Sequence, residues 1–239
     1  MHRFFIEPRG IDGPRATLTG PEAHHLHHVL RLTAGDEIVL FDGTGAVYQA
    51  RIEHMGKEIR LAVTSRQIFA PREPALFIAQ GLLKGKKMDF LVQKATELGV
   101  TGFLPFHSAH CAVPDLKDAK TSRWEKIILE ACKQCGRPIP LQVAPVSDFA
   151  TLLGEAGHYS CKLIFWEKET GTHLAGLAPL AANPSVIALI GPEGGFAPEE
   201  IDKAVQAGFT PVSLGRQILR AETAALSVMA ILQYLSGNL

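Results

Sequence analysis

Cysteine, long apolar runs and a signal-like start are all scarce or missing in this chain of 239 residues. It has only four cysteines, which without a secretory signal indicates reduced thiols. No stretch approaches the roughly 18 consecutive apolar residues of a membrane-spanning helix. The opening MHRFFIEPRG is too polar for a signal peptide. We therefore expect a cytoplasmic protein with no membrane partner, and a hydrophobic content of 46% predicts an ordinary globular fold.

Net charge is also lacking, because 24 basic residues balance 24 acidic ones. The charges are nevertheless segregated along the chain. Residues 71–140 carry 11 Lys and Arg against 7 Asp and Glu, whereas residues 141–239 carry 5 against 9. The basic middle section could face an anionic partner such as a nucleic acid. A solvated surface with clustered charges is the alternative, and charge alone does not decide between them.

The first 66 residues contain short runs with alternating or β-branched apolar residues, separated by turns rich in Gly and Asp. One helix is predicted from Pro21 to about Leu32. Strands at this spacing are typical of a small barrel. Two prolines, Pro71 and Pro74, mark a boundary, so we expect domains at 1–70 and 71–239. The strands are predicted at 2–7, 15–19, 37–42, 46–54 and 58–66.

After the boundary, continuous apolar runs alternate with helical patterns. Strands that are apolar on both faces and alternate with helices are typical of an α/β domain with a parallel sheet covered on both sides. The predicted strands lie at 75–80, 101–106, 162–166, 186–190 and 210–214. The clearest helices are predicted near 88–98 and at 121–135 and 222–235, with another beginning near Pro198.

A glycine-rich loop, IGPEGGFAPEEI, begins at Ile190. It has neither the Lys-Ser or Lys-Thr pair of a P-loop nor the Gly-x-Gly-x-x-Gly dinucleotide fingerprint. Ligands of open parallel sheets bind where strands lead into helices, which favours a ligand at this loop. The carboxylate of Glu193 would repel a pyrophosphate, so an uncharged or cationic ligand such as an adenosyl sulfonium fits better. A tight strand–helix turn without a ligand would explain the glycines as well.

A second stretch, SLGRQILRAETA, begins at Ser213 and leads into the apolar helix predicted at 222–235. GPEGGF and LGRQILRAETA together resemble the RsmE family of SPOUT-class methyltransferases, which modify N3 of a uridine in small-subunit (16S) ribosomal RNA. Further matching segments cover nearly the whole chain. They are HRFF near the start, HVLR with Gly35-Asp36 after it, KATELG at 94–99 and the segment 134–140.

The resemblance implies an α/β protein with a PUA-like β-barrel that helps to hold RNA. A SPOUT domain with a parallel sheet and a C-terminal trefoil knot would follow. It also implies a homodimer that acts on ribosomal RNA within the assembled small subunit. The cofactor would be S-adenosyl-L-methionine, bound bent in the knot, and no metal is expected. The implied cofactor-binding residues are Phe165, Trp166, Ile190, Gly191, Glu193, Gly194, Gly195, Leu214, Gly215, Ile218 and Leu219.

Two residues are candidates for catalysis, because uracil N3 becomes a nucleophile only when its proton leaves. Arg220 could stabilise negative charge on the uracil oxygens through its planar fork of donors. Glu222 could accept a proton or orient Arg220, and we favour orientation. The implied RNA-binding residues are Arg3, Arg9, Arg31, Lys84, Lys86 and Lys87, for which ordinary exposed surface is the alternative.

Other features have simpler interpretations. His24, His25, His27 and His28 lack an accompanying Cys or paired carboxylate, so a solvated or RNA-facing helix is favoured over a metal site. The pair at Cys132 and Cys135 is expected to pack in a core. Ala197 stands where a capping serine would begin a helix, which leaves Pro198 and the Glu199–Glu200 pair to start it.

Three alternatives to a uridine-N3 methyltransferase stay open. The chain could be a catalytically inactive RNA-binding or assembly factor, although its glycine loops are intact. It could be a SPOUT methyltransferase with a different RNA target. A nucleotide-dependent enzyme is disfavoured, because Glu193 stands in the loop and no P-loop lysine follows it.

Overall fold

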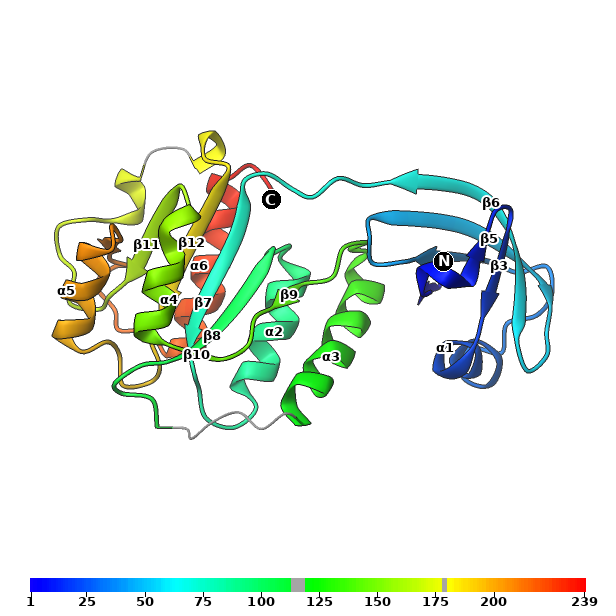
Figure 1. Ribbon diagram of the computed structural model, residues 1–239, viewed down its shortest axis with the longest axis horizontal. Helices are drawn as coiled ribbons and strands as arrows, with labels where there is room; N and C mark the ends of the chain where they lie inside the picture. Colours follow the sequence, from blue (N-terminus) through cyan, green and yellow to red (C-terminus); the bar gives the residue numbers. More distant parts are fainter. Residues whose placement is uncertain (113–118, 178–179) are drawn as a thin grey trace. The chain divides into compact units, whose positions relative to one another are not determined.

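A computed structural model describes residues 1–112, 119–177 and 180–239 of the protein (Figure 1). The chain divides into two compact units. The first comprises residues 1–71 with 129–140, and the second comprises 72–128 with 141–239. None of the helices in the described ranges is long and apolar enough to cross a membrane.

The first unit is built on a curled six-stranded sheet with the order β1-β4-β5-β6-β3-β2. β1 and β4 run parallel, and the other neighbouring pairs are antiparallel. All five strands expected in the first 66 residues are confirmed, and the short β2 was not predicted. The strands are β1 (Arg3–Phe5), β2 (Ile11–Asp12), β3 (Arg15–Leu18), β4 (Glu37–Phe41), β5 (Ala46–His54) and β6 (Ile59–Ile68).

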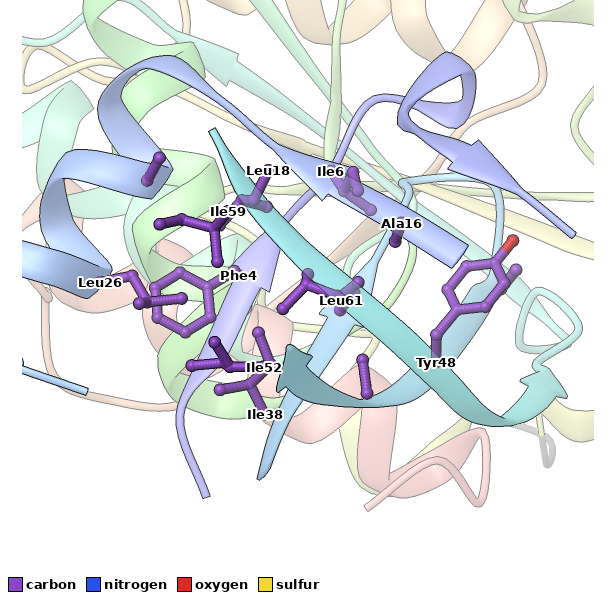
Figure 2. Close-up of a cluster of buried hydrophobic side chains, with 14 residues drawn as sticks. Phe4, Ile6, Ala16, Leu18, Leu26, Ile38, Tyr48, Ile52, Ile59 and Leu61 are labelled. Carbon is purple, nitrogen blue, oxygen red and sulfur yellow. The ribbon is translucent and has the colours of Figure 1, made fainter. Parts of the chain in front are cut away.

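Alternate side chains of these strands fill the inside of the curl, as Figure 2 shows for Phe4, Ile38, Ile52 and Leu61. These side chains are almost completely buried. Fully burying an aliphatic or aromatic side chain of this size contributes about 1.5–3 kcal/mol. Leu26, from the helical segment between β3 and β4, belongs to the same cluster. The alternation predicted from the sequence therefore corresponds to the inner face of this sheet.

The helix predicted from Pro21 to Leu32 is shorter and changes type. The helix α1 (Gly20–His24) continues directly as a π-helix, η2 (His25–Val29), and a 3-10 turn, η1 (Pro8–Gly10), lies earlier in the chain. Arg31 adopts a left-handed backbone with φ of 53°, and the N–H of Leu32 returns to the carbonyl of Leu26. A left-handed residue just beyond a helix ends it. The apolar spacing did not reveal this earlier end.

The second unit contains a seven-stranded sheet with the order β10-β8-β7-β12-β11-β13, and β9 also pairs with β8. Every pairing is parallel, as the apolar runs predicted. The short β9 and β10 were not predicted. The strands are β7 (Ala75–Gly81), β8 (Gly102–His107), β9 (Gln142–Val143), β10 (Ser147–Asp148), β11 (Cys161–Phe165), β12 (Ser185–Ile190) and β13 (Thr210–Val212).

Helices cover both faces of this sheet, with α4 in front and α6 behind in Figure 1. Side chains of α4 and α5 pack with Ile164, Ile187 and Leu189 on one face. On the other face α6 contacts β7, β12 and α2. The helices are α2 (Lys87–Glu97), α3 (Ala119–Cys135), α4 (Phe149–Glu155), α5 (Pro198–Gln206) and α6 (Ala221–Leu235), with 3-10 turns η3 (Ala156–His158), η4 (Leu174–Gly176) and η5 (Leu180–Ala182).

Helix α3 contains the pair Cys132 and Cys135, which the sequence predicted to pack in a core. Cys132 is fully buried, and burial raises the pKa of its thiol to about 12. Cys135 is exposed, so the expectation that it completes the apolar face of the helix is wrong. Cys135 is the last residue of α3.

Candidate functional site

A cavity of about 540 Å³ lies at the carboxyl ends of β11 and β12, beside the segment that follows β13. Because the strands are parallel, these ends meet at one edge of the sheet, where ligands of open α/β folds bind. Lys87 from the start of α2 completes the lining. The cavity brings together all the residues predicted to bind a cofactor, together with both catalytic candidates. These are Phe165, Trp166, Ile190, Gly191, Glu193, Gly194, Gly195, Leu214, Gly215, Ile218, Leu219, Arg220 and Glu222.

The glycine loop after β12 requires glycine for two separate reasons. Gly195 has a left-handed φ of 69°, and a Cβ built there would lie 3.0 Å from a carboxylate oxygen of Glu167. A Cβ on Gly194 would lie 2.7 Å from the Cβ of His110. The carbonyl oxygen of Gly194 also lies 3.0 Å from Nδ1 of His110. Conformation and close packing, rather than flexibility, therefore explain the glycines.

Helix α5 begins directly after this loop without a capping hydroxyl. Glu200 supplies the carboxylate half of a capping box, because its Oε2 accepts a 2.9 Å hydrogen bond from the N–H of Ala197, the residue before the helix. Oε1 of Glu200 accepts another 2.9 Å hydrogen bond from the N–H of Ala109, in the loop after β8. This nearly buried carboxylate starts the helix as the Glu199–Glu200 pair predicted. It also fixes the end of the glycine loop to the neighbouring loop.

Gln80 ties the ends of two central strands together from the side. Its side-chain amide is fully buried at the end of β7 and donates to the carbonyl oxygens of Gly81 at 2.9 Å and Gly191 at 3.1 Å. Gln80 was not among the residues predicted from the sequence. A polar residue closing a continuous apolar run was the signal that could have identified it.

Lys87 forms ion pairs with two carboxylates that come from different loops. Its Nζ lies 3.1 Å from Oε1 of Glu193 and 3.0 Å from Oε2 of Glu222. Oε1 of Glu193 also accepts a 3.1 Å hydrogen bond from the backbone N–H of Lys84. The start of α2, the glycine loop and the start of α6 thus meet at one ammonium group, which we call the Lys87 bridge.

The charges of the Lys87 bridge are fixed by its own contacts. Hydrogen bonds to Glu222 and Glu193 raise the pKa of Lys87. Burial alone would raise the pKa of Glu193, but backbone N–H groups and Lys87 outweigh it and lower that pKa. The N–H of Glu222 itself, at the start of α6, and Lys87 lower the pKa of Glu222 against the effect of burial. All three groups are therefore charged at neutral pH.

Arg220 is the residue immediately before α6 and is exposed. Its positive charge contributes to the lowered pKa of Glu222. Within the described ranges, no hydrogen bond or ion pair holds its guanidinium, whose donors are thus available to a ligand. The N-terminus of α6 adds partial positive charge at the same place. This end of the cavity suits a ligand on which negative charge develops.

Glu167 is a cavity residue that was not predicted from the sequence. It follows β11 and lies beside Gly195. Unlike Glu193 and Glu222, its carboxylate forms no ion pair with the residues that the structure describes. Its place just beyond a predicted strand end was the available signal. Next to it, the indole N–H of Trp166 is buried without a hydrogen-bond acceptor in the described residues.

The residues predicted to bind RNA are not all in one place. Lys84 and Lys86 are exposed just before α2, and Lys87 lies in the cavity within the bridge. The three predicted arginines belong to the first unit and are exposed. Arg3 packs against Gly136, Arg9 pairs with Glu7 at 2.5 Å, and Arg31 ends the π-helix.

No group of three or more His, Cys, Asp or Glu side chains in residues 1–112, 119–177 and 180–239 is arranged to hold a metal ion. In particular, the rings of His24 and His27 each contact the ring of His28.

Family models match both parts of the chain. The model of the RNA methyltransferase domain matches residues 71–233, and that of the RNA methyltransferase PUA domain matches residues 18–62. The ribosomal RNA small subunit methyltransferase E of Bacillus subtilis is 31% identical over 98% of this chain and 96% of its own length. That of Synechocystis is 33% identical over 96% of this chain and 76% of its own length.

Solved structures agree with these matches. The ribosomal RNA small subunit methyltransferase E of Neisseria gonorrhoeae, bound to S-adenosyl methionine, has a TM-score of 0.87 and 31% identity, covering 98% of each chain. A putative methyltransferase of Legionella pneumophila, in complex with the same cofactor, has a TM-score of 0.86 and 31% identity, covering 97% of this chain and 96% of its own.

Fold and cavity therefore define an RNA methyltransferase domain accompanied by a PUA domain. More closely, the chain belongs to the ribosomal RNA small subunit methyltransferase E family. The resemblance recognised in GPEGGF and LGRQILRAETA is confirmed.

Proposed function

We propose that the protein transfers a methyl group from S-adenosyl-L-methionine to N3 of a uridine in small-subunit ribosomal RNA. The observation that carries the proposal is that the loops after β11, β12 and β13 line one cavity together with Arg220. Relatives with this fold are named ribosomal RNA small subunit methyltransferases, and one has been solved with the cofactor bound.

The cavity residues fit this cofactor. The N–H of Trp166 and the carboxylate of Glu167, both unpaired among the described residues, offer a donor and an acceptor for a ligand with amino and hydroxyl groups. The apolar side chain of Ile218 is 82% exposed and can cover an adenine ring. Carboxylates at Glu167 and Glu193 suit a cationic sulfonium and oppose a pyrophosphate. When bound, the cofactor supplies the electrophilic methyl group.

The chain's own residues then have separate roles. Arg220 stabilises the negative charge that develops on the uracil oxygens when N3 loses its proton, and the N-terminus of α6 adds to this effect. Glu222 has a lowered pKa and is paired with Lys87, so it is a poor proton acceptor and instead holds the start of α6 in place. This assignment favours orientation over general-base catalysis for Glu222.

A transfer assay tests the proposal. Purified protein, isotopically labelled S-adenosylmethionine and small-subunit RNA, free or assembled, should yield labelled 3-methyluridine, and cells lacking the protein should lose that mark. An unchanged methylation map would end the uridine assignment. Calorimetric titration with the cofactor and with ATP separates the alternatives, since a nucleotide-dependent enzyme would bind ATP and an inactive RNA-binding factor would bind neither.

The Lys87 bridge gives a prediction for cofactor binding. In Lys87→Met, the carboxylates of Glu193 and Glu222 lose their shared cation and repel each other, so the glycine loop shifts. We expect affinity for S-adenosylmethionine to fall on the order of tenfold, as measured by calorimetry. Lys86→Met is the matched control. Relief of the repulsion in Lys87→Met/Glu222→Gln should restore part of the affinity, and equal affinity in Lys87→Met would remove the bridge from the cofactor site.

The wild-type bridge should be insensitive to pH near neutrality. The pKa of each carboxylate is lowered, so the stabilisation is present above its unfolded pKa and is lost only as pH falls through the lowered value. The pKa of Lys87 is raised, so its contribution is lost only as pH rises through that value. The difference in cofactor affinity between the wild type and Lys87→Met should accordingly stay flat from about pH 6 to about pH 9.

For RNA binding, we propose that the exposed Lys84 and Lys86 bind phosphates. Replacing both by alanine should weaken RNA binding and reduce the slope of log affinity against log salt by about 0.7 for each phosphate that the variant no longer neutralises. Cofactor affinity should not change. Filter binding at several salt concentrations checks this, with Lys126→Ala/Lys203→Ala as a control that removes the same charge elsewhere in the second unit. An unaltered slope would return Lys84 and Lys86 to ordinary surface.

We further propose the family's trefoil knot and homodimer for this chain. In support of a knot, β13 lies at the sheet edge whereas the following α6 contacts the central β7 and β12. The apolar face of α6 does not itself require a partner chain, because Val228, Met229 and Leu232 are buried in the core. Support for the dimer comes instead from large apolar side chains left exposed, including Tyr234 at 71%. Light scattering at micromolar concentration should give twice the chain mass, and a monomer would contradict the dimer.

The same proposal gives the two domains different roles. Residues 1–70 would hold RNA, and residues 71–239 would carry the methyltransferase site. Because the ribosomes of bacteria are in the cytoplasm, we propose the same location for this protein.

A further inference from the structure

The helical segment formed by α1 and η2 contains four histidines that the cofactor cavity does not use. His24, His27 and His28 are exposed. The ring centroids of His24 and His28 lie 4.6 Å apart, and those of His27 and His28 lie 4.5 Å apart, each pair tilted by 39°. The ring of His28 therefore contacts both of the other rings, and the three exposed imidazoles form one cluster, which we call the histidine stack.

The π-helix accounts for this arrangement. Side chains at successive positions of an α-helix do not face each other. His27 and His28 are successive, yet their rings are in contact, and both lie in η2. π-helical turns occur mostly as short segments and are frequent at functional sites. Burial does not explain the stack either, because Leu26 alone of the η2 side chains is buried in the core.

We propose that the histidine stack is a docking surface for unpaired bases of single-stranded RNA, which extend the row of rings by stacking. Sequence-specific and sequence-tolerant RNA-binding proteins hold splayed bases on aromatic side chains, histidine included. The exposed cation of Arg31 follows the stack by three residues and can meet the adjoining phosphate. RNA as the occupant rests on the proposed function, whereas the stack itself rests on geometry.

A metal ion is the competing occupant that the histidines suggest. Metal ligands direct nitrogen atoms toward a common point, whereas these rings contact one another at a tilt of 39°, and no His, Cys, Asp or Glu cluster in the described residues is arranged to hold a metal ion. Phosphate binding by charge alone is the other competitor. It would not require contact between the rings, and it predicts a strong change in salt dependence when the histidines are removed.

The test compares the full-length protein with two triple variants. His24→Ala/His27→Ala/His28→Ala removes the rings, and His24→Phe/His27→Phe/His28→Phe keeps aromatic faces without imidazole nitrogens. The probes are a short mixed-sequence single-stranded RNA and an abasic oligonucleotide of equal length. Base–aromatic stacking gives an expected decrease in affinity of roughly 5- to 150-fold for the alanine variant on the intact RNA. The phenylalanine variant should retain most of the affinity.

Three readouts make the result decisive. Stacking predicts that the alanine variant keeps the wild-type salt slope and that all variants bind the abasic probe equally. His54→Ala/His158→Ala, two exposed histidines elsewhere, controls for loss of imidazole, and circular dichroism confirms folding. Wild-type affinity for intact RNA in the alanine variant would overturn the proposal. So would an equal decrease in the phenylalanine variant, which would indicate a role for the ring nitrogens.

Failure of the proposed function would look different. Wild-type protein would then transfer no methyl group to small-subunit RNA, whatever its affinity for the probe. Methyl transfer by the alanine variant with an unchanged KM for RNA would instead count against the histidine stack alone. Cofactor affinity should be the same in all variants, because the stack and the cavity belong to different units.

Discussion

Replacing Arg220 by alanine is expected to slow methyl transfer by roughly 10- to 150-fold while leaving cofactor affinity nearly unchanged. The range corresponds to a charge-assisted hydrogen bond of about 1.5–3 kcal/mol that acts only in the transition state. The structure supports such a role, because the guanidinium lines the cavity and no ion pair engages it in the described residues. Arg220→Lys should recover only part of the rate, since one ammonium cannot reproduce the two-pronged geometry.

Single-turnover rates at two pH values identify the mechanism. Raising the pH should partly rescue Arg220→Ala, because more uracil then loses its N3 proton without help. Arg216→Ala is the matched control, an exposed arginine that lines the same cavity. Equal slowing of both variants would assign the effect to the general charge of the cavity. Joint loss of cofactor affinity and thermal stability in Arg220→Ala, with no rescue at high pH, would make the residue structural.

Gly195→Val is expected to weaken binding of S-adenosylmethionine by roughly 5- to 30-fold or more. The left-handed φ of 69° costs an ordinary residue about 1–2 kcal/mol. The new Cβ would also meet the carboxylate of Glu167 at 3.0 Å. The loop can relieve the backbone strain and the close contact with Glu167 only by moving. This movement changes the cavity wall that the loop forms.

Calorimetry on purified variants measures the decrease in cofactor affinity. Thermal unfolding shows whether the variant has also lost overall stability. Gly157→Val is the control, because its backbone is not left-handed and nothing lies within 4 Å of an added Cβ. Comparison of Gly195→Ala/Glu167→Ala with Glu167→Ala separates the two causes, since both variants lack the carboxylate and the close approach and only the double variant has the backbone strain. Unchanged affinity in a folded Gly195→Val protein would place the cofactor elsewhere.

Much of the architecture follows from local pattern. Alternating residues such as Ile38 and Leu40 predicted half-buried strands, and the continuous run from Val186 to Ile190 predicted a central parallel strand. Both patterns indicate which side chains are buried. Because burial of apolar surface is the dominant favourable contribution to folding, the structure has the strands that these patterns predict. The two motifs that line the cavity were recognisable because backbone approach requires glycine there and chemistry requires specific side chains.

The features that the sequence did not predict depend on contacts between residues that are distant in the chain. Lys87 and Glu222 are far apart in the chain, and nothing near either residue predicts that one ammonium joins Glu193 and Glu222. Similarly, residues 129–140 group with the first unit although they continue a regular helical pattern. The π-helix was missed for another reason, because its one buried residue, Leu26, lies three positions after Ala23, a spacing that an ordinary α-helix also gives.

The order of the cavity walls along the chain has a consequence for protein synthesis. The wall after β11 leaves the ribosome first, the glycine loop follows, and the wall that contains Arg220 comes after β13. A nascent chain that has reached only β12 already contains every strand of the first unit but lacks Arg220 and α6. Such a chain would have no complete pocket for the methyl donor. Premature termination after β12 therefore yields a product with every strand of the first unit but an incomplete cavity, which cannot place Arg220 beside a methyl donor.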